Sequence, residues 1–186
     1  LLSDSSGTQW HFLPTGTASA TYTNTQDSAC DSGSVQVTRT NFTNLGNNGL
    51  CWSDASLTFD ISDSSIGFGS LSTSGARWAT DDALGSGSDT AAHTITLSTT
   101  ALGGYVLSYI GALPTSGSNT ITAASITNDA DGTPGTSEFG MSIATSGSST
   151  VASGYDHNST PSARDWSWVP NISTPLISSA GPVSTP

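Results

Sequence analysis

Short runs in which apolar and polar residues alternate recur along most of the chain, whereas the spacing of an amphipathic helix is almost absent. Alternation with a period of two is typical of β-strands that bury one face. In residues 57–62 it predicts that Leu57, Phe59 and Ile61 point into a core. The same pattern is found in residues 34–40, 93–99, 119–126, 139–145 and 165–170.

The spacing of strands and turns indicates the fold class. Residues 104–111, with the sequence GYVLSYIG, are apolar on both faces and predict a central strand. The GNNG of residues 46–49 suits a tight turn with positive φ. Only residues 75–85 favour a short helix. Short strands separated by turns predict an all-β fold, specifically an Ig-like or jelly-roll β-sandwich with extended N- and C-terminal arms.

Both ends of the chain differ from its middle. Residues 1–20 and 170–186 are extended and rich in Ser and Thr, and the second segment holds four of the eight prolines. Proline is disfavoured within a central strand because it has no N–H to donate. We therefore expect an N-terminal arm at 1–20, a β-sandwich body at 21–169 and a C-terminal arm at 170–186. The arms would be disordered or would pack on a neighbouring molecule.

The charge composition excludes several functions. The 186 residues include fourteen Asp and Glu, three Arg and no Lys, for a net charge of −11. Nucleic acids and anionic membrane surfaces attract basic proteins, so we expect no nucleic-acid partner. No apolar run approaches the ~20 residues that span a bilayer, so we expect no membrane insertion. Without lysine, no Lys–Asn isopeptide bond can form within the chain, and no sortase-type lysine bond can join its copies.

A folded, secreted chain is the best interpretation of the remaining composition. Only 9% of residues are charged, but five Trp, five Phe and four Tyr argue against disorder. Cys30 and Cys51 predict one disulfide in an oxidising compartment, although two buried free thiols are the alternative. The chain starts at Leu1 without Met, which favours a mature extracellular or cell-surface protein whose leader has been removed.

One acidic loop resembles a calcium-binding loop. Counted from Thr127, the acids Asp129, Asp131 and Glu138 fall at the third, fifth and twelfth positions. Strand-like sequences flank the loop instead of the helices that such a site needs, so a solvated turn is the preferred interpretation. A second acidic loop holds Asp81, Asp82 and Asp89 and is interpreted in the same way. We expect no cofactor, with weak calcium binding as the alternative.

The sequence contains no recognisable catalytic motif. It has no GxSxG nucleophile elbow, and His11, His93 and His157 are scattered. The DSG at 31–33 resembles half of an aspartic-protease pair, but no second copy exists. Glu138 is the only Glu, and no Asp is marked as its partner for glycoside hydrolysis. We therefore expect a protein that is not an enzyme.

Aromatic residues and sequons offer candidate binding sites. Trp166 and Trp168 alternate on one strand face, so they could stack on a sugar, pack in the core or anchor an interface. N-x-S/T sequons, which are candidate N-glycosylation sites, begin at Asn41, Asn158 and Asn171.

Three stretches carry a family resemblance: LTFDISDSSIGFGSLSTSGARWAT (57–80), AHTITLSTTALGGYVLSYIGALPTSGSNTI (92–121) and TPGTSEFGMSIATSG (133–147). In this order they resemble uncharacterised secreted Ser/Thr-rich surface proteins of small-genome bacteria, over about residues 57–186. The resemblance implies no catalytic residues. Such proteins usually continue into one more β-hairpin, which the present sequence does not contain.

The resemblance, without the last hairpin, implies a sheet with an open edge. An open edge is an association hazard unless another strand pairs with it, and a strand from another copy can do so. We therefore expect an extracellular structural subunit of a surface filament, pilus-like, or of a coat. It would assemble with copies of itself by non-covalent exchange of strands or arms. The alternative is a cell-surface adhesion or carbohydrate-binding module that binds glycans through Trp166 and Trp168.

Overall fold

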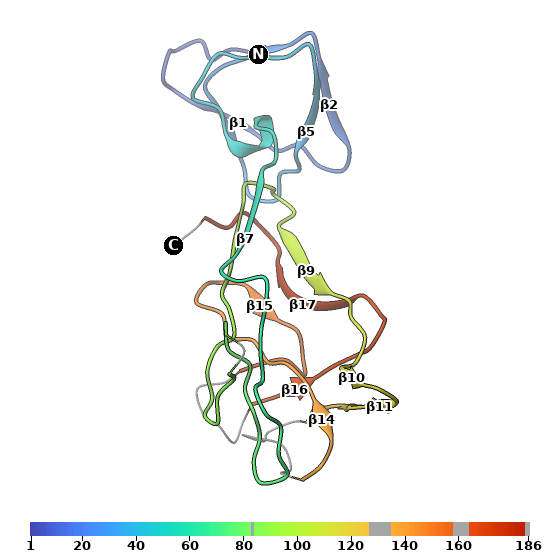
Figure 1. The fold of residues 1–186 in the computed structure, drawn as a ribbon. Helices are drawn as coiled ribbons and strands as arrows, with labels where there is room; N and C mark the ends of the chain where they lie inside the picture. Colours follow the sequence, from blue (N-terminus) through green and yellow to red (C-terminus); the bar gives the residue numbers. More distant parts are fainter. Residues whose placement is uncertain (83, 127–134, 158–163, 185–186) are drawn as a thin grey trace. The chain divides into compact units, whose positions relative to one another are not determined.

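The described part of the chain is all-β, with several small sheets and one short 3-10 helix (Figure 1). The computed structural model describes residues 1–82, 84–126, 135–157 and 164–184. Two compact units are distinguished. The first consists of Leu1–Thr58, Leu97–Tyr105 and Ser179–Pro186, and the second of Phe59–Thr96 and Val106–Ser178.

The first unit contains two coils of a parallel β-solenoid. Its strands are β1 (Trp10–Phe12), β2 (Ala18–Thr21), β3 (Asn24–Thr25), β4 (Ser28–Cys30), β5 (Val37–Thr40) and β6 (Thr43–Asn44). Each strand of the first coil pairs in parallel with its equivalent in the second coil, β1 with β4, β2 with β5 and β3 with β6. Paired residues lie 18 or 19 positions apart, as the pairs Trp10↔Ser28, Ala18↔Val37 and Asn24↔Thr43 illustrate.

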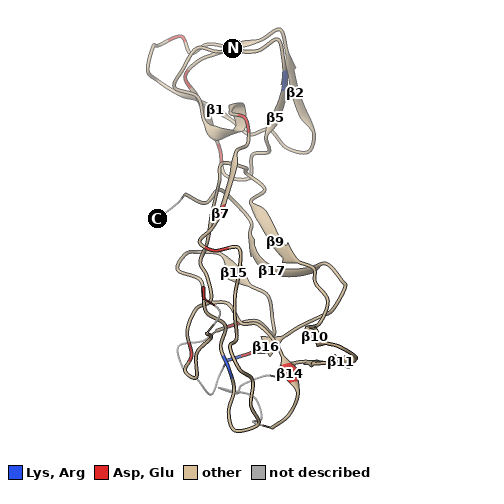
Figure 2. Cartoon of the chain, in the orientation of Figure 1, with Lys and Arg blue, Asp and Glu red and all other residues tan. Residues whose placement is uncertain are grey.

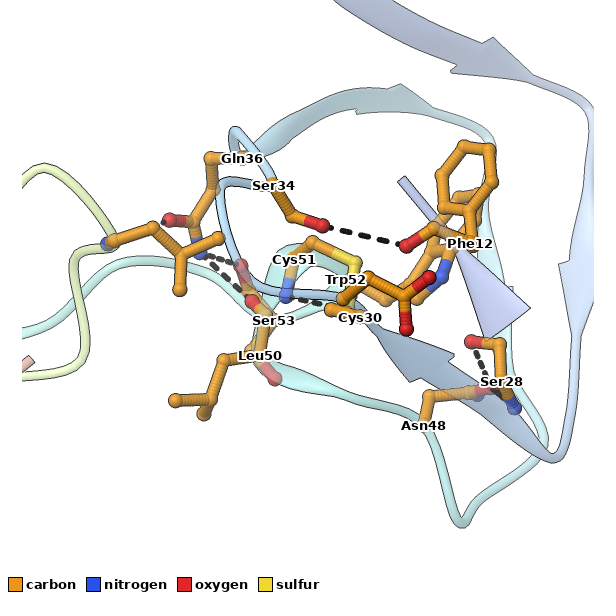
Figure 3. The surroundings of a disulfide bond; sticks show 12 residues. Phe12, Ser28, Cys30, Ser34, Gln36, Asn48, Leu50, Cys51, Trp52 and Ser53 are labelled. Atoms are coloured by element: carbon orange, nitrogen blue, oxygen red, sulfur yellow. Dashed lines mark hydrogen bonds between the residues drawn. A yellow bond between two sulfur atoms is a disulfide. The ribbon is translucent and has the colours of Figure 1, made fainter. Parts of the chain in front are cut away.

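Trp52 fills the interior of these coils. It lies in the 3-10 helix η1 (Leu50–Trp52) and is 1% exposed. Its ring stacks on Phe12 at 5.0 Å and on Phe42 at 5.5 Å, between ring centroids. The neighbouring Cys51 forms the predicted disulfide with Cys30, with a Cα–Cα distance of 5.9 Å (Figure 3). One aromatic side chain and one disulfide thus supply much of the core of the first unit.

Strand pairs in the second unit are more varied. Two further strands, β7 (Leu57–Ile61) and β8 (Ile95–Thr99), pair with each other and have residues in both units. A three-stranded sheet has the order β15-β17-β9, with β15 at Thr150–Val151, β17 at Thr174–Ser179 and β9 at Tyr105–Tyr109. The remaining pairs join β10 (Thr115–Ser116) with β11 (Asn119–Thr120), β12 (Thr122–Ala123) with β14 (Glu138–Phe139), and β13 (Ser125–Ile126) with β16 (Trp166–Ser167).

Aromatic rings pack between these short strands. Trp168 contacts Tyr109 and Phe139, each at 4.7 Å between ring centroids. Tyr109 contacts Tyr155 at 5.9 Å, and their hydroxyl oxygens are 2.8 Å apart. Burial raises the pKa of Tyr155 well above its usual value, and the hydrogen bond with Tyr109 raises it further.

The structure corrects the expected burial of residues 57–62. Leu57, Phe59 and Ile61 are 64%, 52% and 37% exposed. The alternation does form a strand, because β7 covers Leu57–Ile61. However, the apolar side chains of this strand are not buried within the described residues.

The expected central strand at 104–111 is also wrong. Its counterpart β9 is an outer strand, and β17 is in the middle of the sheet. The central strand β17 contains Pro175, although proline is disfavoured within a central strand. Pro175 lies near the start of β17, and the registered pairs with β15 begin after it at Ile177 and Ser178. The missing N–H therefore removes no bond of that ladder.

The helix expected at 75–85 is absent from the described residues there. Thr80 instead forms an isolated bridge with Gly67, and Trp78 forms one with Ser86. The Asp82 Oδ1 atom accepts hydrogen bonds from the Thr80 hydroxyl at 2.6 Å and from the Leu84 N–H at 2.8 Å. These bonds lower the Asp82 pKa and favour a turn over a helix.

The expected arms contain ordered strands. Residues 1–20 include β1 and part of β2, and residues 170–186 include β17. Extended arms are therefore not confirmed, and neither is the sandwich arrangement.

Candidate functional site

The edge of the first coil, made by β1 and β2, is open. In a parallel pair, alternate residues direct their backbone polar groups toward one neighbour, and the intervening residues direct theirs to the opposite side. The Trp10 N–H donates to the Asp27 carbonyl at 2.8 Å, and the Tyr22 N–H donates to the Thr40 carbonyl at 2.9 Å. By this alternation, the N–H groups of His11 and Ser19 point away from the second coil. No other strand pairs with β1 or β2 in the described part of the chain.

The corresponding edge of the second coil is covered at β4. The Gly49 N–H donates to the Ser28 carbonyl at 2.7 Å. The Asn48 Oδ1 atom accepts from the Ser28 N–H at 3.1 Å and from its hydroxyl at 2.9 Å (Figure 3). The turn that the GNNG sequence predicted thus satisfies the outward polar groups of Ser28. Gly46 and Asn47 in this turn have the predicted positive φ values, 107° and 51°.

Two side chains continue this cover beside β5. The Gln36 amide donates to the carbonyls of Leu50 at 3.0 Å and Ser53 at 2.7 Å (Figure 3). The Arg39 guanidinium donates to the Trp52 carbonyl and pairs with Asp54. These bonds hold η1 against the second coil, so this end of the solenoid is capped.

The first coil is also electrically neutral apart from one histidine. Residues 8–26 contain no Asp, Glu, Lys or Arg, although the whole chain has a net charge of −11. Figure 2 shows acidic positions in both units and very few basic ones. Native sheet edges are commonly protected from association by charged side chains, above all lysine. The strands of the open edge have no such protection.

Tyr22 has an unusual conformation at this edge. It follows β2 directly, is 81% exposed and has a φ of 51°. Asn41 occupies the equivalent corner of the second coil, nineteen residues later, with a φ of 49°. Asn tolerates this left-handed region, whereas a bulky residue such as Tyr is disfavoured in it.

Trp166 and Trp168 contact different groups. Trp168 packs on Tyr109 and Phe139, and Trp166 lies 6.1 Å from His157 between ring centroids. Both tryptophans are half-buried. A sugar platform requires exposed ring faces, so the packing of Trp168 favours the core interpretation over the platform.

The predicted acidic sites are dispersed among the described residues. Asp89 binds His157 at 3.1 Å and also pairs with Arg164. Asp81 and Asp82 are exposed, and Glu138 lies in β14. Asp129 and Asp131 lie outside the described residues. No group of three or more His, Cys, Asp or Glu side chains arranged to hold a metal is found within 1–82, 84–126, 135–157 and 164–184.

The sequons occupy different environments. Asn41 and Asn171 are exposed, and both have positive φ values, 49° and 61°. Asn158 lies outside the described residues.

A polar hollow of about 370 Å³ lies beside His93 in the second unit. Asp63 and Asp81 are among its lining residues. In the described structure, neither carboxylate forms a hydrogen bond with His93, so the hollow has no carboxylate-oriented base. His11 does bind Asp31 at 2.6 Å, but on an exposed surface of the first unit.

Comparison with protein-family models, curated proteins and solved structures found no match to the chain. Among the described residues, no helix has the length and apolar character needed to cross a bilayer.

The sequence analysis predicted neither that Trp52 fills the interior of the coils nor that the edge of β1 and β2 is open. The available signal for Trp52 was its position directly after Cys51 in a turn-rich segment.

Proposed function

We propose that this chain is an extracellular structural subunit of a surface filament or coat, without enzymatic activity, that assembles with copies of itself through β-strand pairing. The observation that carries the proposal is the asymmetry of the solenoid. At one end, Asn48 and Gly49 bind the outward polar groups of Ser28, and Gln36 and Arg39 hold η1 beside β5. At the other end, no group of the described residues binds the outward backbone groups of His11 in β1 or Ser19 in β2. Solenoids need a polar cap at each end to remain soluble as single molecules.

Other features agree with a structural role outside the cell. A disulfide joins Cys30 to Cys51, and disulfides persist in oxidising compartments. In β7, the side chains of Leu57, Phe59 and Ile61 are exposed although their alternation is that of a buried face. We propose that a neighbouring copy covers this strand, and that the small sheets of the second unit close into a β-sandwich only in the assembly.

The proposal changes the role of the expected arms. Residues 1–20 contain β1 and part of β2, so they would bind a neighbour while remaining paired with their own chain. Residues 170–186 contain β17, most of which belongs to the second unit, and their last part belongs to the first unit, where Val183 forms a bridge with Thr99.

Negative-stain microscopy and sedimentation of the whole chain over a range of concentrations test the proposal. We expect particles larger than the monomer that form without added ligand. A chain that stays monomeric at every concentration would overturn the proposal. If glycans then quench the tryptophan fluorescence, the adhesion or carbohydrate-binding alternative replaces it.

A further inference from the structure

We infer that the open edge of the first coil, formed by β1 and β2, docks against the same edge of a second copy, related by a twofold axis. This inference rests on the proposed function and specifies the surface by which copies meet. The β1 and β2 edges would pair antiparallel between the two copies. Tyr22 from each copy would pack at the border of the contact.

The capped end of the solenoid determines which edges can meet. A head-to-tail stack would need the free edge of the second coil, but at β4 that edge already binds Asn48 and Gly49. Beside β5, the side chains of Gln36 and Arg39 bind the segment that contains η1. The bonds at β4 and the segment held beside β5 obstruct that edge, so contact is favoured at the like end, and contact between like ends is isologous. A twofold axis perpendicular to an edge strand places the partner strand antiparallel to it.

The edge presents unsatisfied backbone groups at two places. His11 in β1 and Ser19 in β2 direct their N–H and C=O groups away from the second coil, as the bonds of Trp10 and Tyr22 show. Leu1 lies along β3 instead, where its carbonyl accepts from the Gln26 N–H at 3.1 Å. The pairing surface is therefore β1 and β2 and excludes β3.

Charge favours a second copy as the occupant. Two molecules with a net charge of −11 repel each other most where their acids face one another. Residues 8–26 carry no Asp, Glu, Lys or Arg, and their one histidine, His11, binds Asp31, so like copies can meet there with little direct repulsion. A strongly basic partner would instead bind the acidic parts of the chain.

Tyr22 supplies the side-chain part of the contact. It is 81% exposed. The exposed Leu1 donates to the carbonyl of Asn24, two residues after Tyr22, at 2.7 Å. The left-handed conformation of Tyr22 is unfavourable for Tyr, whereas the equivalent residue of the next coil is Asn41. A bulky aromatic residue kept in a strained, exposed corner suggests a functional constraint. Tyr is also enriched among the residues that dominate interface energies.

Sedimentation equilibrium of the whole disulfide-bonded chain tests this inference with two variants. Tyr22→Asn places the residue of the second coil at the first corner, which keeps the backbone favourable and removes the aromatic ring. Ser19→Pro removes one outward N–H and leaves the N–H groups that face β5. We expect each variant to weaken self-association by roughly tenfold or more. Circular dichroism and a thiol assay check that the fold and the disulfide are retained.

Two matched controls locate the effect. Ser19→Thr keeps the N–H and a strand-compatible side chain, so its association should equal that of the unchanged protein. Leu50→Asn alters an apolar side chain, 42% exposed, at the capped end, and should also have no effect. Association that is unchanged in both Tyr22→Asn and Ser19→Pro would overturn the inference, although the proposed function would stand through another surface. An unchanged protein that never associates would overturn both. Weakening by Leu50→Asn alone would assign the contact to the capped end and also overturn the inference.

Discussion

Strands of the first unit pair with strands 18 or 19 residues later, whereas pairs of the second unit range from Thr115↔Thr120 to Ser125↔Ser167. The first arrangement repeats one geometry, so a single interior can be filled by one large side chain. The second joins strands of mostly two residues, so the rings of Tyr109, Phe139, Tyr155 and Trp168 must hold several sheets together.

The difference shows two ways of ordering a chain that is poor in apolar and charged residues. Stacked coils pair their backbone polar groups by repeating one geometry, and a disulfide restricts the conformations open to the unfolded chain. Irregular short strands rely instead on contacts between aromatic rings and on the hydrogen bonds of their hydroxyl groups. If this comparison is correct, damage to one unit should leave the hydrogen-exchange protection of the other largely unchanged.

Removal of the Trp52 ring should have the largest effect. Trp52→Ala leaves a cavity between Phe12 and Phe42 and should destabilise the first unit by about 3–5 kcal/mol. Hydrogen exchange of β1–β6 and of β15–β17 measures the two units separately. Trp52→Phe is the control: it keeps an aromatic ring, and the indole N–H has no hydrogen-bond partner among the described residues. Equal loss of protection in both units would contradict the comparison.

Loss of the disulfide should come next. Replacement of Cys30 and Cys51 together by Ala should cost the first unit roughly 3 kcal/mol. The two residues are 21 positions apart, and without the cross-link the unfolded chain is no longer closed into this loop and gains conformational entropy. Denaturant unfolding followed by hydrogen exchange of each unit gives the measurement. The protection of β15–β17 should be unaffected, and a matching shift there would show that the units unfold together.

Gly49→Ala tests how tightly the cap fits. An added Cβ would lie 2.5 Å from the Cys30 Sγ atom and 2.7 Å from the Cys30 nitrogen. The φ of Gly49 is −69°, so the expected loss of about 1–3 kcal/mol arises from crowding and not from backbone strain. Gly103→Ala is the matched control in the same unit, because an added Cβ there meets nothing within 4 Å. Equal unfolding midpoints for the two variants would show that the cap is loose.

Tyr155→Phe should have the smallest effect on stability, and this effect should be confined to the second unit. It removes the hydroxyl that lies 2.8 Å from that of Tyr109, which should cost about 1 kcal/mol at neutral pH. The pKa of Tyr155 is raised in the folded state, so above pH about 10 the unfolded chain loses this proton first. Stability should therefore fall as the pH rises past that value, and less so in the variant. An identical alkaline loss in both proteins would assign it to other groups.

The sequence indicates local features of this fold better than it indicates partners. It predicts the disulfide, the GNNG turn and the strand at Leu57–Ile61 because each depends on neighbouring residues. Alternation shows that a segment has two faces, but it does not identify the strand that pairs with it. The outer position of β9 and the central position of β17 therefore could not be predicted.

The solenoid was hidden for a related reason. Equivalent positions of the two coils hold different residues, such as Ala18 with Val37 and Tyr22 with Asn41, so no repeat is visible in the sequence. The candidate site could not be predicted for the same reason. The edge of β1 and β2 can be recognised as open only once it is known which strands pair with each other. The neutrality of residues 8–26 is the part of the site that the sequence alone contains.

The three arginines hold parts of the fold in place. Arg39 binds the Trp52 carbonyl and Asp54, Arg77 binds the carbonyls of Phe68 and Leu84, and Arg164 pairs with Asp89. A trypsin-like protease must draw an arginine side chain into its own pocket before it can cut, and this chain has no lysine to offer instead. Cleavage at any of the three positions therefore requires a local opening of the fold, and digestion by trypsin should be slow.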